Sequence, residues 1–272
     1  MPLKNQYEVI IVGYGPLGQL CALLLSKLGI RTAIIERYKD INPLPRASVV
    51  DDQSLRLMNV IEIYDEIKNL FNTPEFLDYT LPDGKILQRS IVKETLDGYP
   101  NVSTFYQPDL ENALRKMVSK SDLIDLYLQH DLISLRETDS SVSVKCKSIE
   151  KNKLNEIEGS FLIACDGVNS SIRKKLKIPS EDLKYNKDWL IVDINTNEKS
   201  LLGNTIRQIC DYERPTSFTY LSDKRCRWEF QLLPGEDKDE MMQDHKIVSL
   251  IEKYIDSSSY SIDRRDIYKF RA

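Results

Sequence analysis

The chain has 272 residues, a formal net charge of -4, 41% hydrophobic residues and 29% charged residues, which is an ordinary soluble composition. Its mild acidity gives no support for nucleic-acid binding or for attraction to an anionic membrane. No stretch reaches the roughly 18 apolar residues of a membrane-spanning helix, so we expect no membrane span and a cytoplasmic location. The length allows one large domain or two smaller ones.

Between Val9 and Glu36 the sequence predicts a strand, a glycine turn, a helix and a second strand, beginning V-I-I-V-G-Y-G-P-L-G. Gly13 allows the sharp turn out of the strand, and Gly15 lets a pyrophosphate approach the backbone. Gly18 lets the helix pack close to the sheet. This spacing, inside a strand-helix-strand unit, is typical of a dinucleotide site.

Both ends of this helix-strand pair support the same interpretation. Pro16 suits a first helical position, and the helix N-terminus around Pro16 and Leu17 offers N–H groups and a partial positive charge to phosphates. Glu36 ends the second strand, where a carboxylate accepts hydrogen bonds from ribose hydroxyls. NAD, NADP and FAD all use this arrangement, and Glu36 argues only against a 2′-phosphate.

The middle of the chain predicts a proline-containing loop, two helices and a hairpin. The loop K-D-I-N-P-L-P-R-A precedes a helix with apolar spacing at Asp51–Ile67. Tyr79–Val92 predicts a hairpin that turns at Pro82–Gly84. A second helix is predicted at Asp109–Lys120, with Asp109 as its N-cap.

The remainder of the chain is mostly strand-like, which gives an α/β fold class. A Rossmann-like domain, with a βαβ unit and a parallel sheet, is predicted to interleave with a mostly β substrate-side sheet. The expected strands are Leu126–Gln129, Ser141–Ile149, Glu156–Cys165, Asp188–Thr196, Ile206–Cys210, Ser217–Tyr220, Arg225–Leu233 and Asp266–Phe270, with a surface helix at Asp239–Tyr254.

The chain is poor in side chains that commonly perform catalysis or bind metals. Only two histidines occur, His130 and His245, so a zinc site or a histidine-driven triad has little support. The cysteines have no C-x-x-C pair and are expected to be reduced; they are Cys21, Cys146, Cys165, Cys210 and Cys226. We therefore predict no metal ligands and no catalytic side chain, because a bound cofactor would carry the chemistry.

Four stretches carry further motifs: V-I-I-V-G-Y-G-P-L-G through E-R, P-L-P-R-A-S-V-V-D-D, Y-Q-P-D-L-E-N-A-L and F-L-I-A-C-D-G-V-N-S-S-I-R. A weaker fifth pairs Q-I-C-D-Y-E-R-P-T-S-F with R-W-E-F-Q-L-L-P-G-E. In this order they resemble the FAD-dependent aromatic hydroxylases, single-component flavoprotein monooxygenases, and most nearly the 3-(3-hydroxyphenyl)propionate hydroxylase type. The resemblance implies an FAD-binding domain at 1–183, with inserted segments at about 70–105, and a β-rich substrate-side domain at 184–272.

The resemblance also implies which residues would contact FAD: Gly13, Gly15, Pro16, Leu17, Gly18, Glu36, Arg37, Arg46, Gln107, Asp166 and Gly167. Arg46 would lie near the flavin and a mobile loop, and Gln107 would hydrogen-bond the cofactor. Asp166 would accept hydrogen bonds from ribityl hydroxyls, which would offset the cost of a buried carboxylate. A solvated arginine is an equal alternative at Arg37, and Arg173 would fix the Asp166 loop or form a structural salt bridge.

The implied reaction uses NAD(P)H to reduce FAD and O₂ to form a flavin C4a-hydroperoxide, which hydroxylates a small aromatic, phenolic substrate. The protein would orient the substrate and exclude water. The sequence does not identify the substrate and does not decide between NADH and NADPH as the electron donor. It also leaves open whether the protein forms a homodimer.

The chain departs from the family at its C-terminal end. Family members continue into a Gly-Asp turn that contacts the flavin, and this sequence contains no Gly-Asp dipeptide and ends at Tyr268–Ala272. Only the N-terminal portion of the family fold is therefore expected, with an open sheet edge and impaired activity. The alternatives are an inactive or non-catalytic fragment that retains weak nucleotide binding, and another FAD-dependent oxidoreductase of epoxidase, halogenase or oxidase type.

Overall fold

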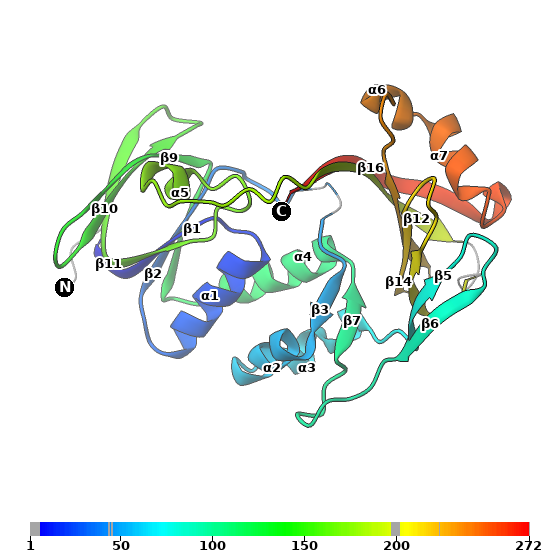
Figure 1. Ribbon diagram of the computed structural model, residues 1–272. Helices are drawn as coiled ribbons and strands as arrows, with labels where there is room; N and C mark the ends of the chain where they lie inside the picture. The colour runs from blue at the N-terminus through cyan, green and yellow to red at the C-terminus, as the bar shows by residue number, and fades with distance from the viewer. Residues whose placement is uncertain (1–5, 43, 45, 197–201, 223, 272) are drawn as a thin grey trace. The chain divides into compact units, whose positions relative to one another are not determined.

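The computed structural model describes every residue except 1–5, 43, 45, 197–201, 223 and 272, so the two prolines of the predicted loop lie outside the described residues. The chain divides into a first unit, residues 1–42 with 108–180, and a second unit, residues 43–107 with 181–272 (Figure 1). The division near residue 180 lies close to the predicted boundary at 183. Residues 43–107 group with the second unit, because a strand at Phe76–Thr80 pairs with one at Thr205–Ile209.

A six-stranded sheet forms the first unit from β1 (Gln6–Val12), β2 (Thr32–Glu36), β8 (Ile124–Leu128), β9 (His130–Glu137), β10 (Val142–Ser148) and β11 (Leu154–Ala164). The strand order is β8-β2-β1-β11-β10-β9. The strands β8, β2, β1 and β11 run parallel, and β10 and β9 continue the sheet antiparallel. This order puts the C-terminal ends of β1, β2 and β11 side by side at one edge of the parallel part, which is where ligands bind in such sheets.

Helices α1 (Pro16–Lys27) and α4 (Gln107–Val118) lie on one face of this sheet, and the short α5 (Ser171–Lys175) lies on the other (Figure 1). The central strand β1 is apolar on both faces because both are covered. Ile11 packs in one buried cluster with Ala22 of α1, and Ile10 packs in another with Ile172 of α5.

The strand β11 is paired on both sides for only part of its length. It pairs with β10 from Leu154 to Gly159 and with β1 on the other side as far as Ala164. Within the described residues, nothing pairs with the β10 side of β11 beyond Gly159, and Phe161 is 68% exposed there. This side of β11 is therefore unpaired over its last residues.

The second unit contains a seven-stranded and a three-stranded sheet. The large sheet comprises β5 (Phe76–Thr80), β6 (Ile86–Ile91), β12 (Asn186–Thr196), β13 (Thr205–Ile209), β14 (Thr216–Ser222), β15 (Arg225–Gln231) and β16 (Tyr260–Arg271), in the order β16-β12-β15-β14-β13-β5-β6. The small sheet has the order β3 (Val49–Asp51), β7 (Val102–Phe105) and β4 (Phe71–Asn72). All neighbours are antiparallel except β13 and β5.

The two faces of the large sheet differ in chemistry. Along β15, Trp228 and Phe230 point into the main buried cluster, which also contains Ile247 of α7 (Asp244–Ile251). The alternate residue Arg227 therefore projects from the opposite face, opposite Asp193 of β12. This opposite face, which we call the polar face, carries the charges discussed below.

Most predicted strands are confirmed within a few residues, but the predicted helices need three corrections. Asp51–Ile67 is two helices, α2 (Asp52–Val60) and α3 (Tyr64–Ile67), because Glu62 adopts a left-handed φ of 63° between them. The predicted surface helix at Asp239–Tyr254 is likewise split into α6 (Lys238–Met241) and α7 by Gln243, whose ψ of 144° is extended.

The N-cap predicted at Asp109 is also wrong, because α4 begins at Gln107 and Asp109 lies in its first turn. The strand predictions were incomplete. The strands β3, β4, β7 and β9 were not predicted, and β16 begins at Tyr260 rather than Asp266. Short 3₁₀ turns at Lys68–Leu70 and Ser257–Ser259 complete the regular structure.

Candidate functional site

The glycine turn after β1 is confirmed in geometry, and two of its glycines are required by the fold. Gly13 has a φ of +106°, and a Cβ built there would lie 2.2 Å from the carbonyl oxygen of Cys165. A Cβ on Gly18 would lie 2.0 Å from the carbonyl oxygen of Gly13. Both contacts are to main-chain atoms, so β11 and α1 approach the turn only because these side chains are absent.

Gly15 is different, because no described residue requires a glycine there. Its φ of -75° is open to any residue, and no atom of the described residues lies within 4 Å of a Cβ built on it. The space in front of Gly15 adjoins the first turn of α1, where Leu17 is 63% exposed and Pro16 occupies the first helical position. An open space at a helix N-terminus fits a pyrophosphate group, so the residues present fit a dinucleotide.

Glu36 ties the turn to the end of β2. One carboxylate oxygen accepts a hydrogen bond from the Tyr14 N–H at 2.7 Å, and the other accepts from the Tyr38 N–H at 2.9 Å. Each carboxylate oxygen can accept a second hydrogen bond, so these contacts orient Glu36 and leave capacity for a ribose hydroxyl. Arg37 pairs with Asp131 at 3.2 Å and is largely exposed.

Asp166 caps the loop and helix that follow β11. Its carboxylate accepts hydrogen bonds from the Ser170 hydroxyl and the Ser171 N–H, both at 2.6 Å, and from the Ile172 N–H at 3.2 Å. Burial alone would raise the pKa of Asp166, but these hydrogen bonds outweigh burial and the pKa lies below its ordinary value. The carboxylate is therefore ionised at neutral pH.

The loop around Asp166 meets the glycine turn. Gly167 has a φ of +79°, and the Arg173 guanidinium donates to the carbonyl oxygen of Val168 at 3.0 Å, as expected for a residue that fixes this loop. The Cys165 N–H donates to the carbonyl oxygen of Val12 at 2.7 Å. The first unit thus brings the turn, Glu36 and the Asp166 loop together at the ends of three neighbouring parallel strands.

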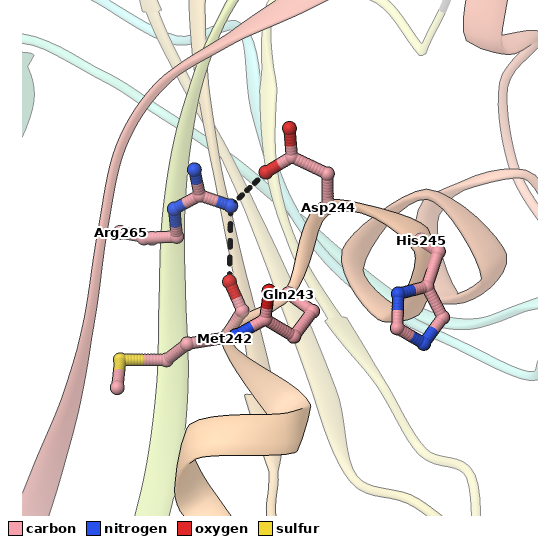
Figure 2. Close-up of a pocket in the computed structure, with 5 residues that line it drawn as sticks. All are labelled: Met242, Gln243, Asp244, His245 and Arg265. Carbon is pink, nitrogen blue, oxygen red and sulfur yellow. Dashed lines mark hydrogen bonds and ion pairs between the residues drawn. The ribbon is translucent and has the colours of Figure 1, made fainter.

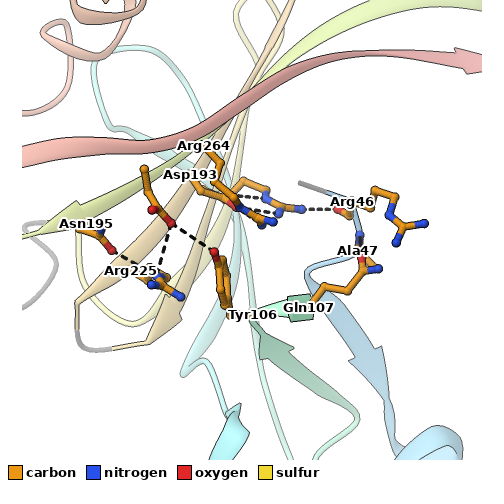
Figure 3. Close-up of polar contacts among 10 residues, drawn as sticks. Arg46, Ala47, Tyr106, Gln107, Asp193, Asn195, Arg225 and Arg264 are labelled. Carbon is orange, nitrogen blue, oxygen red and sulfur yellow. Dashed lines mark hydrogen bonds and ion pairs between the residues drawn. The ribbon is translucent and has the colours of Figure 1, made fainter. Parts of the chain in front are cut away.

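The other two predicted contacts, Arg46 and Gln107, belong to the second unit. Gln107 is 4% exposed, and its side-chain oxygen accepts a hydrogen bond from the Ala47 N–H at 2.8 Å. The carbonyl oxygen of Arg46 accepts a hydrogen bond from the Arg227 guanidinium (Figure 3). Gln107 and Arg227 therefore both hold the short segment Arg46–Ala47.

The sequence interpretation missed the charged cluster on the polar face. Its members are Asp193, Arg227, Arg264, Arg225, Asp263 and Tyr106, several of which appear in Figure 3. Asp193 and Arg227 are 0% and 1% exposed, and two guanidiniums share the Asp193 carboxylate. Burial raises the pKa of the neighbouring Glu229, Arg227 lowers it and Asp193 raises it, with a net upward shift. The alternation R-C-R-W-E-F in β15 was the available signal, because it places charges opposite a buried aromatic row.

An open depression elsewhere in the second unit is lined by Met242, Gln243, Asp244, His245 and Arg265 (Figure 2). The Arg265 guanidinium donates to the carbonyl oxygen of Met242 at 3.0 Å and pairs with Asp244. None of the predicted site residues lines it. Across the described part of the chain, no group of three or more potential ligands could hold a metal ion, and no helix is long and apolar enough to cross a membrane.

Comparison with known sequences identifies relatives along nearly the whole chain. A family model described as an FAD binding domain matches residues 6–263. A 3-(3-hydroxy-phenyl)propionate/3-hydroxycinnamic acid hydroxylase of Comamonas testosteroni is 25% identical over 271 residues, 99% of this chain and 45% of that protein. The hydroxylase of the same name from Burkholderia cenocepacia (strain HI2424) is 28% identical over 272 residues, 98% of this chain and 48% of that protein. The chain spans about half the length of the curated relatives it matches.

Solved structures share the fold. The p-nitrophenol 4-monooxygenase from Pseudomonas putida DLL-E4 matches with a TM-score of 0.88 at 17% identity, covering 98% of this chain and 69% of that one. An aklavinone-11 hydroxylase, solved with FAD and aklavinone, matches with a TM-score of 0.78 at 18% identity, covering 97% and 54%. The predicted α/β fold class and the predicted resemblance, limited to the N-terminal portion of the relatives, are confirmed.

Proposed function

Because the chain belongs to the FAD-binding domain family, we propose that it binds FAD and takes part in hydroxylating a small phenolic substrate with O₂ and NAD(P)H. The substrate class comes from the relatives, which are named as hydroxylases of 3-(3-hydroxyphenyl)propionate and 3-hydroxycinnamic acid. The observation that carries FAD binding is the open space at Gly15, where the fold itself needs no glycine. The proposed location is cytoplasmic, as the scattered cysteines without a C-x-x-C pair led us to expect.

In this proposal the first unit holds the ADP half of the cofactor. The N–H groups of Leu17 and Gly18 in the first turn of α1 donate to the pyrophosphate, since the first N–H groups of a helix have no partner within it. Glu36, already oriented by two main-chain N–H groups, accepts from the adenosine ribose. Arg37 is proposed to lie beside the adenosine at the exposed rim.

The ribityl chain and the flavin are assigned to Asp166, Gly167, Arg46 and Gln107. Because the pKa of Asp166 is lowered, its carboxylate is an anionic acceptor for hydroxyl groups at neutral pH. The chemistry that FAD supplies when bound is electron transfer from NAD(P)H and activation of O₂ for insertion into an aromatic ring. The residues of the chain bind, orient and exclude water, and none is proposed as a catalytic acid or base.

An absorbance spectrum of the purified chain, recorded after incubation with FAD and desalting, tests the proposal. Retained visible flavin bands support it, and a colourless protein contradicts FAD binding by this chain. NAD(P)H oxidation is then measured with and without 3-(3-hydroxyphenyl)propionate, together with peroxide release. Oxidation that depends on the phenol and yields hydroxylated product supports the hydroxylase function. Bound flavin without such oxidation supports the non-catalytic alternative, and peroxide alone supports an oxidase.

A further inference from the structure

A single peptide unit, the one joining Arg46 to Ala47, is held at both of its polar groups. Its carbonyl oxygen accepts a hydrogen bond from the guanidinium of Arg227 in β15. Its N–H donates to the side-chain oxygen of Gln107 at 2.8 Å. Figure 3 shows the Gln107 side chain reaching toward Ala47 from the start of α4. Both residues that hold the peptide unit are almost fully buried, at 1% and 4% exposed.

The contact from Gln107 extends the ladder between β3 and β7. Val49 pairs with Thr104, and the Phe105 N–H donates to the carbonyl oxygen of Ser48 at 3.0 Å. The chain then turns into α4 at Gln107, so its main chain no longer runs beside the residues that precede β3. The Ala47 N–H finds its acceptor in the side chain of Gln107, just beyond the end of this ladder.

The contact from Arg227 is oriented by a buried ion pair. Asp193 accepts from the Arg227 Nε at 2.7 Å and from its Nη2 at 3.1 Å, a two-point contact that fixes the plane of the guanidinium. The remaining terminal nitrogen, Nη1, is the one that donates to Arg46. The ion pair therefore directs one N–H of Arg227 at the peptide unit. Arg264 lies on β16, which pairs with the other edge of β12, and it donates to the same carboxylate at 2.6 Å.

We propose that Gln107 and Arg227 form a clamp on the Arg46–Ala47 peptide unit and act as positioning residues for Arg46. The consequence for Arg46 rests on the proposed function, in which its guanidinium contacts the flavin portion of FAD. The clamp sets the main-chain position from which that side chain extends, so cofactor binding does not have to order the segment. Gln107 thereby contributes to the site through Ala47, in addition to the cofactor contact proposed for it above.

Limited trypsin digestion tests the clamp directly, because trypsin cleaves after arginine and the clamped unit is the Arg46–Ala47 bond itself. Cleavage is followed by mass spectrometry in the absence of FAD. Gln107→Met removes the acceptor, whereas the matched variant Gln107→Glu keeps an oxygen at the same reach. Loss of one hydrogen bond predicts about tenfold faster cleavage in Gln107→Met and wild-type protection in Gln107→Glu.

Arg227→Met is compared with Arg264→Met in the same assay. Each substitution removes one guanidinium from Asp193, but only the first removes a clamp hydrogen bond. Arg227→Met is expected to cleave about tenfold faster or more at Arg46–Ala47, and Arg264→Met is expected to stay near wild type. Cleavage after Arg207 in β13 reports global unfolding of the same unit and should not change in parallel.

Two results overturn the clamp. One is unchanged cleavage at Arg46–Ala47 in both Gln107→Met and Arg227→Met. The other is equal acceleration in Arg227→Met and Arg264→Met, which would mean that the charge cluster supports the unit as a whole. FAD titration of the same variants is read separately. Faster cleavage with unchanged FAD affinity upholds the clamp and contradicts the proposed flavin contact of Arg46, so the two failures are distinguishable.

Discussion

Replacement of Gly15 by alanine is expected to weaken FAD binding strongly while leaving the fold intact. The new methyl group enters a space with no chain atom within 4 Å, at a φ of -75° that alanine adopts freely. Alanine is a poorer N-cap than glycine, and it also loses less conformational entropy on folding. These two effects oppose each other, so the free energy of unfolding should change by less than about 1 kcal/mol.

The same methyl group would occupy the place proposed for the pyrophosphate. Displacing the phosphate oxygens from the N–H groups of α1 forfeits one or two charge-assisted hydrogen bonds of about 1.5–3 kcal/mol each. FAD affinity should therefore fall by about tenfold to 10⁴-fold. Gly13→Ala and Gly18→Ala supply the contrast, because their methyl groups would meet main-chain oxygens at 2.2 and 2.0 Å. Each should destabilise the fold by more than about 3 kcal/mol.

The assay combines urea denaturation, followed by circular dichroism, with flavin fluorescence titration of each variant. Only Gly15→Ala is expected to separate the two measurements. An FAD dissociation constant equal to that of the wild type in Gly15→Ala would refute the placement of the pyrophosphate. A loss of stability comparable to that of Gly13→Ala would refute the reasoning from open space.

Three further predictions concern charge and thiol chemistry. Asp166→Ala should lower the free energy of unfolding by about 1–2 kcal/mol at neutral pH, by removing the hydrogen bonds that the carboxylate accepts from the Ser171 and Ile172 N–H groups at the start of α5. Since the pKa of Asp166 is lowered in the folded state, this contribution is present above the unfolded pKa near 3.9 and is lost as the pH falls through the folded pKa. A difference in urea midpoint between wild type and Asp166→Ala that is the same at every pH would contradict this prediction. Asp193→Asn breaks a buried ion pair and should lower the free energy of unfolding, measured by thermal denaturation, by about 3–5 kcal/mol. The control Glu240→Gln breaks an exposed ion pair and should lower it by less than about 1 kcal/mol. A hydrogen bond from Cys165 lowers the pKa of Cys21 to about 7, and burial raises that of Cys146 to about 11. Iodoacetamide at about pH 8 should therefore alkylate Cys21 before Cys146 in peptide mass analysis, and alkylation of Cys146 before Cys21 would exclude this assignment.

The site in the first unit could be predicted from the sequence because its signals are local. The turn, the helix start and Glu36 occur within one strand-helix-strand unit, and each has a steric or electrostatic requirement that few residue types meet. Asp166 follows β11, whose last four residues are apolar and whose parallel pairing with β1 brings Asp166 to the turn. Local spacing and one strand pairing were therefore sufficient for this half of the site.

The helix errors also have a local cause. Apolar spacing runs on through Ile61 and Ile63, although Glu62 between them leaves the helical region with a φ of 63°. Nothing in the side chain of a glutamate marks a left-handed residue, which is ordinarily glycine or asparagine. The split at Gln243 is similar, because glutamine is a good helix former that here has an extended backbone.

The clamp could not be predicted in the same way, because it joins residues 46, 107 and 227 from three separate segments. Its geometry depends on strand register, since a shift of one residue between β12 and β15 would turn Arg227 toward the aromatic cluster. The alternation in β15 indicates the face on which Arg227 lies, but no local pattern in the sequence identifies Asp193 as its cross-strand partner or Arg46 as its acceptor.

One irregularity shows how the register is maintained at the other edge of β12. Ile262 and Ile267 both pack against the main buried cluster, yet they are five residues apart, which a regular strand would place on opposite faces. The pairing of β16 with β12 shifts between Asp193 and Ile194, so that Ile194 pairs with Ile262 while Asp193 pairs with Arg264. A bulge of one residue at Asp263 resolves the conflict.

The bulged residue, Asp263, is a member of the charged cluster. Asp263 lies 3.8 Å from the Arg225 guanidinium and accepts a hydrogen bond from the Tyr106 hydroxyl at 3.3 Å. Tyr106 directly precedes Gln107 in the chain. The bulge therefore keeps both isoleucines in the core and Arg264 on Asp193, and it adds a contact to the segment that leads into the clamp. The odd spacing of Ile262 and Ile267 was visible in the sequence, and it implies that deleting Asp263 would force either an isoleucine onto the polar face or Arg264 off it.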